Sequence, residues 1–183
     1  MERLIEMEKD IIEEKARRLL KEQGSDPITF DIVALAQSLG FEVFTSDLDD
    51  WDDGYIIANE FGQPIPGASS SKVIVVNRTR DAKFKRFVVA HELGHYKLKS
   101  GSDSIFAHRE SKSAVKTENE QEVDYFAAAL LMSKDEFVTA FNRLRAEGKS
   151  IAECTVELSN LFRAPMESVL SRLEELNLLP EAA

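Results

Sequence analysis

The sequence has a single cysteine, Cys154, and no long run of apolar residues among its 183 positions. One cysteine excludes an intrachain disulfide, and a reducing cytoplasm is the simplest compartment for such a chain. No apolar stretch approaches the roughly 18 residues that a membrane-spanning helix requires, so we expect no membrane partner. Residues 1–6 are charged from the start and lack the apolar core of a signal peptide. The composition therefore predicts a cytoplasmic globular protein.

Basic residues are outnumbered by acidic ones. The chain has 23 Lys and Arg and 33 Asp and Glu, which gives a formal net charge of −10. A domain that binds nucleic acid usually presents a basic surface, and this chain as a whole would be repelled by phosphate. We therefore expect no direct contact with nucleic acid. An acidic enzyme could instead attract a basic protein substrate.

Histidine is rare as well, and two of the three histidines in the chain lie in His91-Glu92-Leu93-Gly94-His95. On a helix, residues four apart project from one face about 6 Å apart along the axis, which suits two nitrogen ligands of one Zn²⁺. Glu92 is turned about 100° away from His91, where a carboxylate can accept a proton from a metal-bound water. The pattern predicts two metal ligands and a catalytic general base, with one Zn²⁺ per chain.

The surroundings of this pattern favour a helix from about Asp81 to Leu98, since residues 86–90 supply an apolar run that can be buried. Gly94 in mid-helix costs about 1 kcal/mol relative to alanine, which indicates that a neighbouring element packs too close there for a Cβ. The alternative is a surface helix whose two histidines are solvated.

A second acidic pattern predicts the third ligand. Glu120 and Asp124 share one stripe of a helix with the apolar residues Ala127 and Leu131, so both carboxylates would face inward. Glu122 lies about 200° around from Glu120 and should face another way. We therefore expect Glu120 to bind the metal and Asp124 to hold the tautomer of a histidine ligand through a hydrogen bond. The alternative is an ordinary acidic helix N-terminus, which the helix dipole also favours.

Around these residues the chain resembles the ImmA/IrrE family of HExxH zinc metallopeptidases, over roughly residues 10–176. The resemblance rests on the histidine pair and on the residues that surround both acidic patterns: Arg86-Phe87, Glu120, Asp124, Phe126-Ala127-Ala128 and Leu130-Leu131-Met132. Val123 stands where that family usually has alanine, and Ser133 where it usually has proline. Neither departure removes a proposed ligand.

The pattern of elements is α+β. Three strands are expected near residues 41–44, 55–58 and 73–76, forming a small, mostly antiparallel sheet packed on the zinc-binding helix, as in a zincin-like fold of the gluzincin type. Capping boxes at Ser133 and Ser150 predict further helices, so the C-terminal half should be helical. We expect a single metallopeptidase domain over residues 1–183, with a catalytic core at 1–132 and a helical part of the same domain at 133–183.

Substrate contacts are less clearly marked. His108 lies in a long polar connection over residues 99–117. Either it contacts the substrate or a transition-state oxyanion, or it is a solvent-exposed side chain with no part in the reaction. Tyr125 flanks a ligand and is either an oxyanion donor or a packing residue. An extended peptide could bind along an edge strand, and the candidates for that edge are residues 69–73 and 54–56. Whether the 99–117 connection is an inhibitory lid stays open.

These observations favour a zinc-dependent endopeptidase. The family resemblance implies a restricted substrate, namely a helix-turn-helix repressor whose cleavage switches on genes of a mobile element or a stress response. One alternative is a regulatory binding module that sequesters a partner protein without cutting it, although Glu92, which a pure binder would not need, is intact. Another is hydrolysis of a small amide. Substrate identity, cleavage site, activating signal and oligomeric state are not specified by the sequence.

Overall fold

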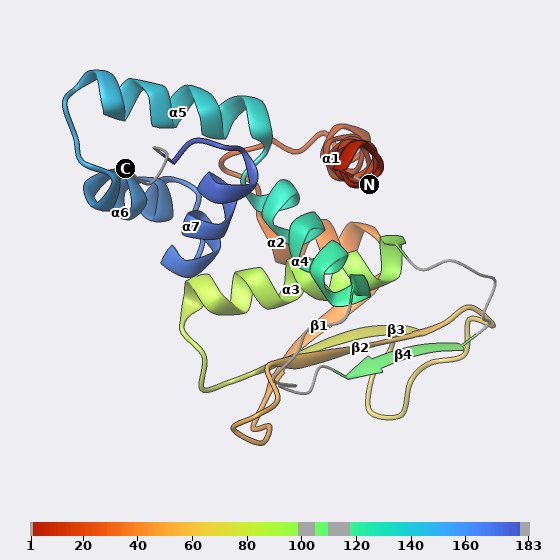
Figure 1. Ribbon diagram of the computed structural model, residues 1–183. Coiled ribbons are helices and arrows are strands. Elements are labelled where there is room, and N and C mark those ends of the chain that lie inside the picture. Colours follow the sequence, from red (N-terminus) through yellow and green to blue (C-terminus); the bar gives the residue numbers. More distant parts are fainter. Residues whose placement is uncertain (1, 99–104, 110–117, 180–183) are drawn as a thin grey trace. The chain divides into compact units, whose positions relative to one another are not determined.

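The structure is a computed structural model that describes residues 2–98, 105–109 and 118–179, with side chains described for 7–98 and 118–179 (Figure 1). Seven helices and four strands lie within these ranges, which confirms the α+β prediction. The helices are α1 (Glu2–Glu22), α2 (Ile32–Ser38), α3 (Ala82–Leu98), α4 (Glu118–Leu131), α5 (Lys134–Ala146), α6 (Ile151–Leu161) and α7 (Met166–Glu175), and the strands are β1 (Phe41–Ser46), β2 (Gly54–Asn59), β3 (Lys72–Asn77) and β4 (Ile105–Arg109). None of the described helices is both long enough and apolar enough to cross a membrane.

The chain forms two compact units. The first comprises residues 1–29 and 128–183, and the second comprises residues 30–127. The sheet, α2, α3 and the first part of α4 belong to the second unit, while α1 and the C-terminal helices belong to the first. The predicted division of a single domain at residue 132 stays a prediction.

The sheet has the strand order β1-β3-β2-β4. β1 pairs parallel with β3, whereas β2 pairs antiparallel with both β3 and β4. The expected mostly antiparallel, three-stranded sheet was therefore wrong: the sheet is mixed, and its fourth strand lies inside the predicted polar connection. β4 has only five residues, and its sequence Ile-Phe-Ala-His-Arg does not alternate apolar and polar positions, so it lacks the signal from which strands are predicted.

The order of the strands also corrects the expected edges. The predicted edge at residues 54–56 lies in β2, and the one at residues 69–73 leads into β3, which begins at Lys72. Both of these strands are interior to the sheet. Their buried residues agree with this placement, because Ile56 and Ile74 are fully buried. Among the described strands, the edges are β1 and β4.

Within the second unit, α3 is held in place by contacts at its start and along its length. The Asp81 carboxylate accepts hydrogen bonds from the backbone N–H groups of Lys83 (2.8 Å) and Phe84 (3.0 Å), so the helix begins one residue after the predicted start. Arg86 is buried, donates to the carbonyl oxygen of Phe30 (3.0 Å) and stacks over its ring. The helix then packs against β2 and β3, on one face of the sheet (Figure 1).

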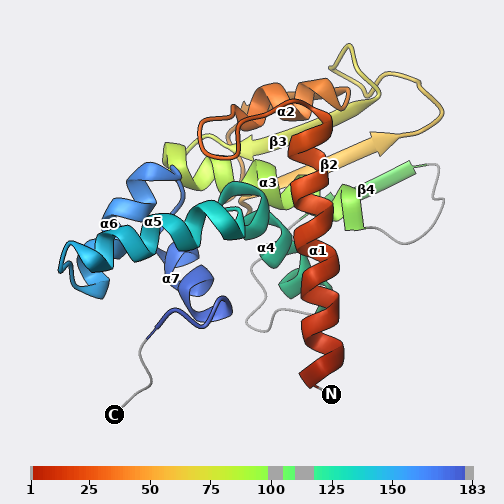
Figure 2. The same ribbon diagram turned by 90° about the horizontal axis from the view of Figure 1, so that it is seen from above.

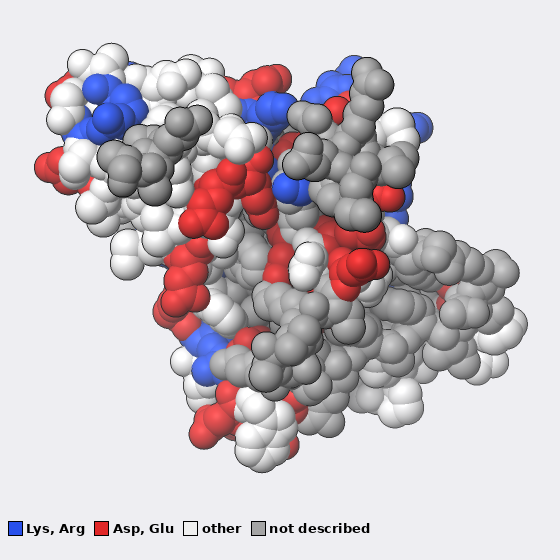
Figure 3. Space-filling model, viewed as in Figure 1, with Lys and Arg blue, Asp and Glu red and all other residues white. Residues whose placement is uncertain are grey.

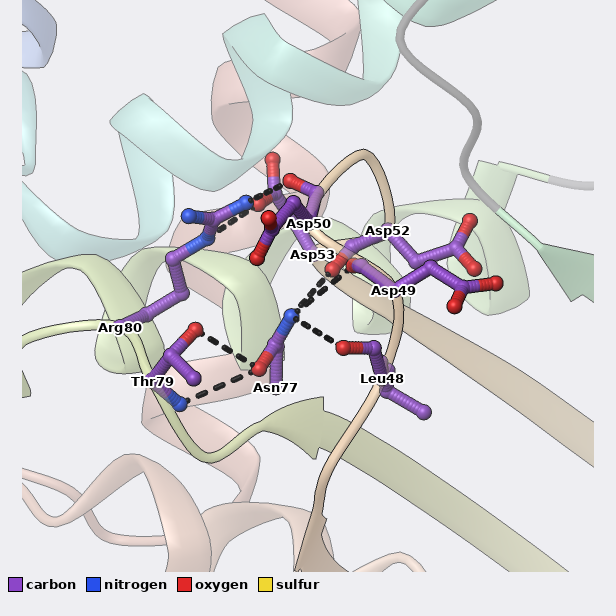
Figure 4. Close-up of polar contacts among 8 residues, drawn as sticks. All are labelled: Leu48, Asp49, Asp50, Asp52, Asp53, Asn77, Thr79 and Arg80. Atoms are coloured by element: carbon purple, nitrogen blue, oxygen red, sulfur yellow. Dashed lines mark hydrogen bonds and ion pairs between the residues drawn. The ribbon is translucent and has the colours of Figure 1, made fainter.

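The turn that leads into β2 is held by two polar side chains (Figure 4). The Asn77 amide donates to the carbonyl oxygens of Asp49 (3.2 Å) and Asp52 (2.8 Å). Arg80 donates to the Asp53 carboxylate at 2.6 Å. These bonds hold the acidic turn over residues 47–53 in one conformation, and they fix where β2 begins beside α3.

The first unit consists largely of helices, of which α1 is one uninterrupted helix (Figure 2). Arg172 of α7 is fully buried, donates to the carbonyl oxygen of Met132 (3.2 Å) and pairs with Glu13 of α1 (2.6 Å). The prediction that helices begin after Ser133 and Ser150 is confirmed by α5 and α6. The capping box itself is present at Ser150. It is absent at Ser133, whose hydroxyl donates to the Glu136 carboxylate and makes no bond to the helix backbone.

Candidate metal centre

Three side chains from two helices converge on one point in the second unit. His91 and His95 extend from α3, and Glu120 extends from the start of α4. The two Nε2 atoms are 3.0 Å apart, and the Glu120 Oε2 atom lies 3.4 Å from that of His91 and 3.6 Å from that of His95. Among the described residues, this is the one group of three His, Cys, Asp or Glu side chains that meets closely enough to hold a metal ion.

The separations fit a small tetrahedral metal. Nitrogen and oxygen ligands at about 2.0–2.1 Å from a tetrahedral Zn²⁺ lie about 3.3 Å from one another. The three separations in this group, 3.0, 3.4 and 3.6 Å, lie on both sides of that value. Both imidazoles are almost fully buried, so their nitrogens are shielded from competing water. This group can therefore hold a metal ion with little rearrangement.

Asp124 sets the tautomer of His91. The Nδ1–H of His91 donates to Asp124 Oδ1 at 2.9 Å, and the two residues lie on α3 and α4. With the proton on Nδ1, the Nε2 atom keeps its lone pair, which points toward His95 and Glu120. The hydrogen bond also fixes the ring orientation. The role of Asp124 in supporting a ligand histidine stays a prediction, with which this hydrogen bond agrees.

Glu92 lies beside the start of β2. Its side chain is fully buried, and a Cβ built on Gly54 would lie 3.6 Å from its Oε1 atom. The same Cβ would lie 2.6 Å from Val88 Cγ1 and 2.8 Å from the carbonyl oxygen of Val75, closer than side chains tolerate. Glycine at position 54 therefore lets the strand approach α3 at the turn that bears Glu92.

Gly94 allows a second close approach, to another side of α3. A Cβ at this position would lie 3.0 Å from Val123 Cγ1 and 3.2 Å from the Val123 carbonyl oxygen and from Phe126 Cδ1. The expectation that a neighbouring element packs too close there for a Cβ is confirmed. The neighbour is α4, and its proximity brings Glu120 to the two histidines.

A family model described as the IrrE N-terminal-like domain (Peptidase_M78) matches residues 36–174, which include every residue of this site. The chain belongs to the IrrE N-terminal-like family. The resemblance stated from the sequence is thereby confirmed. The family model is that of a peptidase, and the three converging side chains agree with the metal binding that such an enzyme needs.

A solved structure with the same fold gives a second comparison for this IrrE N-terminal-like domain. It is a Mycobacterium tuberculosis transcriptional regulator, with 21% sequence identity and a TM-score of 0.58. The match covers 89% of this chain and 46% of that one, so the chain spans less than half the length of its structural relative. At this identity the likeness establishes the fold alone. No curated protein is similar enough to count as a match.

The remaining predicted site residues of this IrrE N-terminal-like domain lie as follows. Glu122 is exposed and lies outside the converging group, as its position on the helix predicted. Tyr125 is buried. His108 belongs to β4 and pairs with Ile56 in the strand register, but its side chain lies outside the described residues. Its role and that of Tyr125 stay predictions.

One polar cluster at the C-terminal part of α3 could not be predicted from the sequence. Tyr96, which follows His95, accepts a hydrogen bond from Lys72 Nζ (2.6 Å) and donates to Glu60 (3.1 Å). Burial by itself would lower the pKa of Lys72, but the hydrogen bond to Tyr96 and the charge of Glu60 outweigh it, and the pKa is raised. The cluster ties the C-terminal part of α3 to the sheet. No sequence pattern indicates it, because Glu60, Lys72 and Tyr96 are distant in sequence and meet only in the folded chain.

Proposed function

We propose that this chain is a zinc-dependent endopeptidase. The observation that carries the proposal is the close convergence of His91 Nε2, His95 Nε2 and Glu120 Oε2, with a buried carboxylate, Glu92, directly after the first ligand. Two imidazoles and one carboxylate are a donor set typical of catalytic zinc, which keeps a fourth position for water or substrate. The family membership supports the same assignment.

Each residue has a distinct part in the proposed reaction. A Zn²⁺ ion bound by His91, His95 and Glu120 would lower the pKa of its water toward about 7 and polarise a carbonyl group. Glu92 accepts the proton of the attacking water and passes it to the departing amide nitrogen. Asp124 keeps the His91 ring oriented and its Nδ1 protonated throughout. The close approach of β2 at Gly54 shields the Glu92 carboxylate from bulk water.

The proposed substrate is a basic protein, and within that class a helix-turn-helix repressor. The net charge of −10 favours a basic partner, and acidic side chains are prominent on the face drawn in Figure 3. β4 pairs with β2 on one side, so an extended peptide can add to its other side by β-augmentation. The structural relative named as a transcriptional regulator agrees with a regulatory role. Cleavage would then control gene expression in the cytoplasm.

Metal content tests the ligand set. We expect one zinc per chain in purified wild type, loss of that zinc in Glu120→Ala, and retention of it in Glu122→Ala. Glu122 is a matched control because it lies on the same helix, carries the same charge and is exposed. A wild type that cannot be loaded with zinc, or equal loss in both variants, would overturn the assignment.

Turnover is tested separately with Glu92→Gln, which keeps the shape of the side chain and removes its basicity. Wild type and variant are incubated with a proteome-derived peptide library, and new amino termini are identified by mass spectrometry. We expect cleavage by wild type alone, with equal zinc in both proteins. Zinc-loaded wild type that cuts nothing would favour the alternative, a binding module that sequesters its partner.

A further inference from the structure

Glu92, the proposed general base, lies on the face of α3 that packs against the sheet, and its side chain is fully buried. Val88 precedes it by four residues, so these two side chains share one stripe of the helix. His91 and His95 form a neighbouring stripe and meet Glu120 of α4 instead. The base and the metal ligands on α3 therefore have different neighbours.

The neighbour of Glu92 is Gly54, the first residue of β2. A Cβ on Gly54 would lie 3.6 Å from Glu92 Oε1, which is an ordinary van der Waals distance, so the backbone of β2 lies alongside the carboxylate. The same Cβ would lie 2.6 Å from Cγ1 of the buried Val88 and 2.8 Å from the carbonyl oxygen of Val75. Neither atom is the far end of a flexible side chain. Any side chain at position 54 must therefore move the start of β2 away from α3 and from Glu92.

The start of β2 is also held by the turn that precedes it. The backbone N–H of Asn77 donates to the carbonyl oxygen of Asp53 (2.9 Å), and the buried Asn77 amide donates to that of Asp52 (2.8 Å). Arg80 donates to the Asp53 carboxylate and to the carbonyl oxygen of Asp50, both at 2.6 Å (Figure 4). Asn77 is the last residue of β3, and Arg80 lies two residues before α3. The connection from β3 to α3 thus holds the start of β2 in place.

We propose that Gly54 and Arg80 are positioning residues for the general base: Gly54 lets β2 lie against the Glu92 carboxylate, and Arg80 holds the strand there. This inference rests on the proposed function, because it takes Glu92 as the base. Both residues act through Glu92 and do not touch the substrate. Their effect on the rate is large because misplacing a catalytic group by about 1 Å can cost about 100-fold.

Gly54→Ala tests the contact itself. We expect the variant to keep its zinc, because the ligands are supported by α4 and not by β2, and to lose about 10–100-fold in kcat. The values of kcat and kcat/KM should fall together, since Glu92 acts in the transition state and does not bind the substrate. The kinetic probe is a fluorogenic peptide that carries a sequence cut by wild type in the peptide library. Loss of zinc, or a change in KM alone, would overturn the proposal.

Arg80→Ala tests the support of the strand without adding an atom to the core. It should keep its zinc and lose at least about threefold in kcat, and Arg80→Lys should recover most of that loss because lysine can still pair with Asp53. Arg78→Ala is the matched control, since the pair of Arg78 with Asp47 (3.1 Å) is exposed and its loss should leave kcat unchanged. Equal effects of Arg78→Ala and Arg80→Ala would overturn the proposal.

Stability gives a readout that does not depend on turnover. Val88→Ala should destabilise Gly54→Ala less than it destabilises wild type, because it removes the methyl group that would lie 2.6 Å from the added Cβ. Urea unfolding of the four proteins measures this difference, and circular dichroism checks that each one is folded. Additive effects would show that the two positions do not touch, which would overturn the proposal.

Glu92→Gln separates this proposal from the proposed function. If Glu92→Gln is inactive while Gly54→Ala and Arg80→Ala turn over like wild type, the positioning role is wrong and the function stands. If Glu92→Gln itself turns over like wild type, Glu92 is not the base and both proposals are wrong. Loss of kcat in all three variants, each with its zinc, is the result that we expect.

Discussion

Gly94 of α3 and Val123 of α4 lie so close together that a Cβ added to Gly94 would be 3.0 Å from Val123 Cγ1. The contact lies one residue from His95 and three residues from Glu120, which are both proposed ligands of the metal. The separation of the two helices is thus set by the absence of a side chain on α3. The bulk of Val123 makes this contact tighter.

Gly94→Ala should destabilise the protein by up to about 2 kcal/mol. Alanine gains about 1 kcal/mol in helix propensity, but overpacking against α4 costs about 1–3 kcal/mol, and the backbone oxygen of Val123 cannot move away alone. Val123→Ala should cost less in the Gly94→Ala background than in wild type, with a coupling of about 1 kcal/mol. Urea unfolding of the four proteins measures this cycle. Strictly additive free energies would contradict the proposed contact.

Asp124→Ala should weaken metal binding by about 10–100-fold, because His91 loses the acceptor that holds its Nδ1–H. Asp124→Asn should weaken it less, since the amide oxygen can still accept that hydrogen bond. Competition with a chromophoric zinc chelator measures both affinities. Glu122→Gln serves as the control on the same helix. An unchanged affinity in Asp124→Ala would mean that the His91 ring is positioned by other contacts.

Tyr96→Phe should lower stability by about 1 kcal/mol and leave zinc content and turnover unchanged. The Tyr96 hydroxyl is engaged by Lys72 and Glu60, so its loss removes hydrogen bonds that tie α3 to the sheet. Thermal unfolding measures the stability change, and the peptide-library assay measures turnover. A large drop in turnover with normal zinc content would instead assign Tyr96 to the catalytic step.

Glu175 should make stability depend on pH near neutrality. Burial raises the pKa of Glu175 to about 7 from an ordinary 4.5, against the opposing charge of Arg172. The folded state binds this proton more tightly than the unfolded state does. The contribution of the protonated Glu175 to the free energy of unfolding is therefore complete below about pH 4.5 and is lost as pH rises through about 7. Glu175→Gln should therefore lose less stability than wild type between pH 5 and 8, by on the order of 2 kcal/mol.

The measurement is chemical unfolding at several pH values, with Glu174→Gln as the control. Glu174 precedes Glu175 on α7, carries the same charge and is exposed. Its variant should follow the wild-type pH profile. If Glu175→Gln also follows the wild-type profile, the carboxylate is already ionised at neutral pH and its burial is less costly than the structure indicates.

Most elements could be predicted from the sequence because their signals are local. The helix expected from about Asp81 to Leu98 matches α3 within one residue, and apolar runs located β1, β2 and β3. The spacing of His91 and His95 needed only helix geometry. The capping box at Ser150 followed from the same local pattern that failed at Ser133, where the hydroxyl pairs with Glu136 instead.

By itself, the sequence determined the family, the α+β class and the candidate ligands, since these depend on residue type and on spacing within one helix. The tertiary structure decided the mixed order of the sheet, its edges at β1 and β4, and the Lys72–Tyr96–Glu60 cluster. It also brought Glu120 within 3.6 Å of both histidines. These features join residues distant in sequence, and which of them meet depends on how strands pair and helices pack, which no local pattern records.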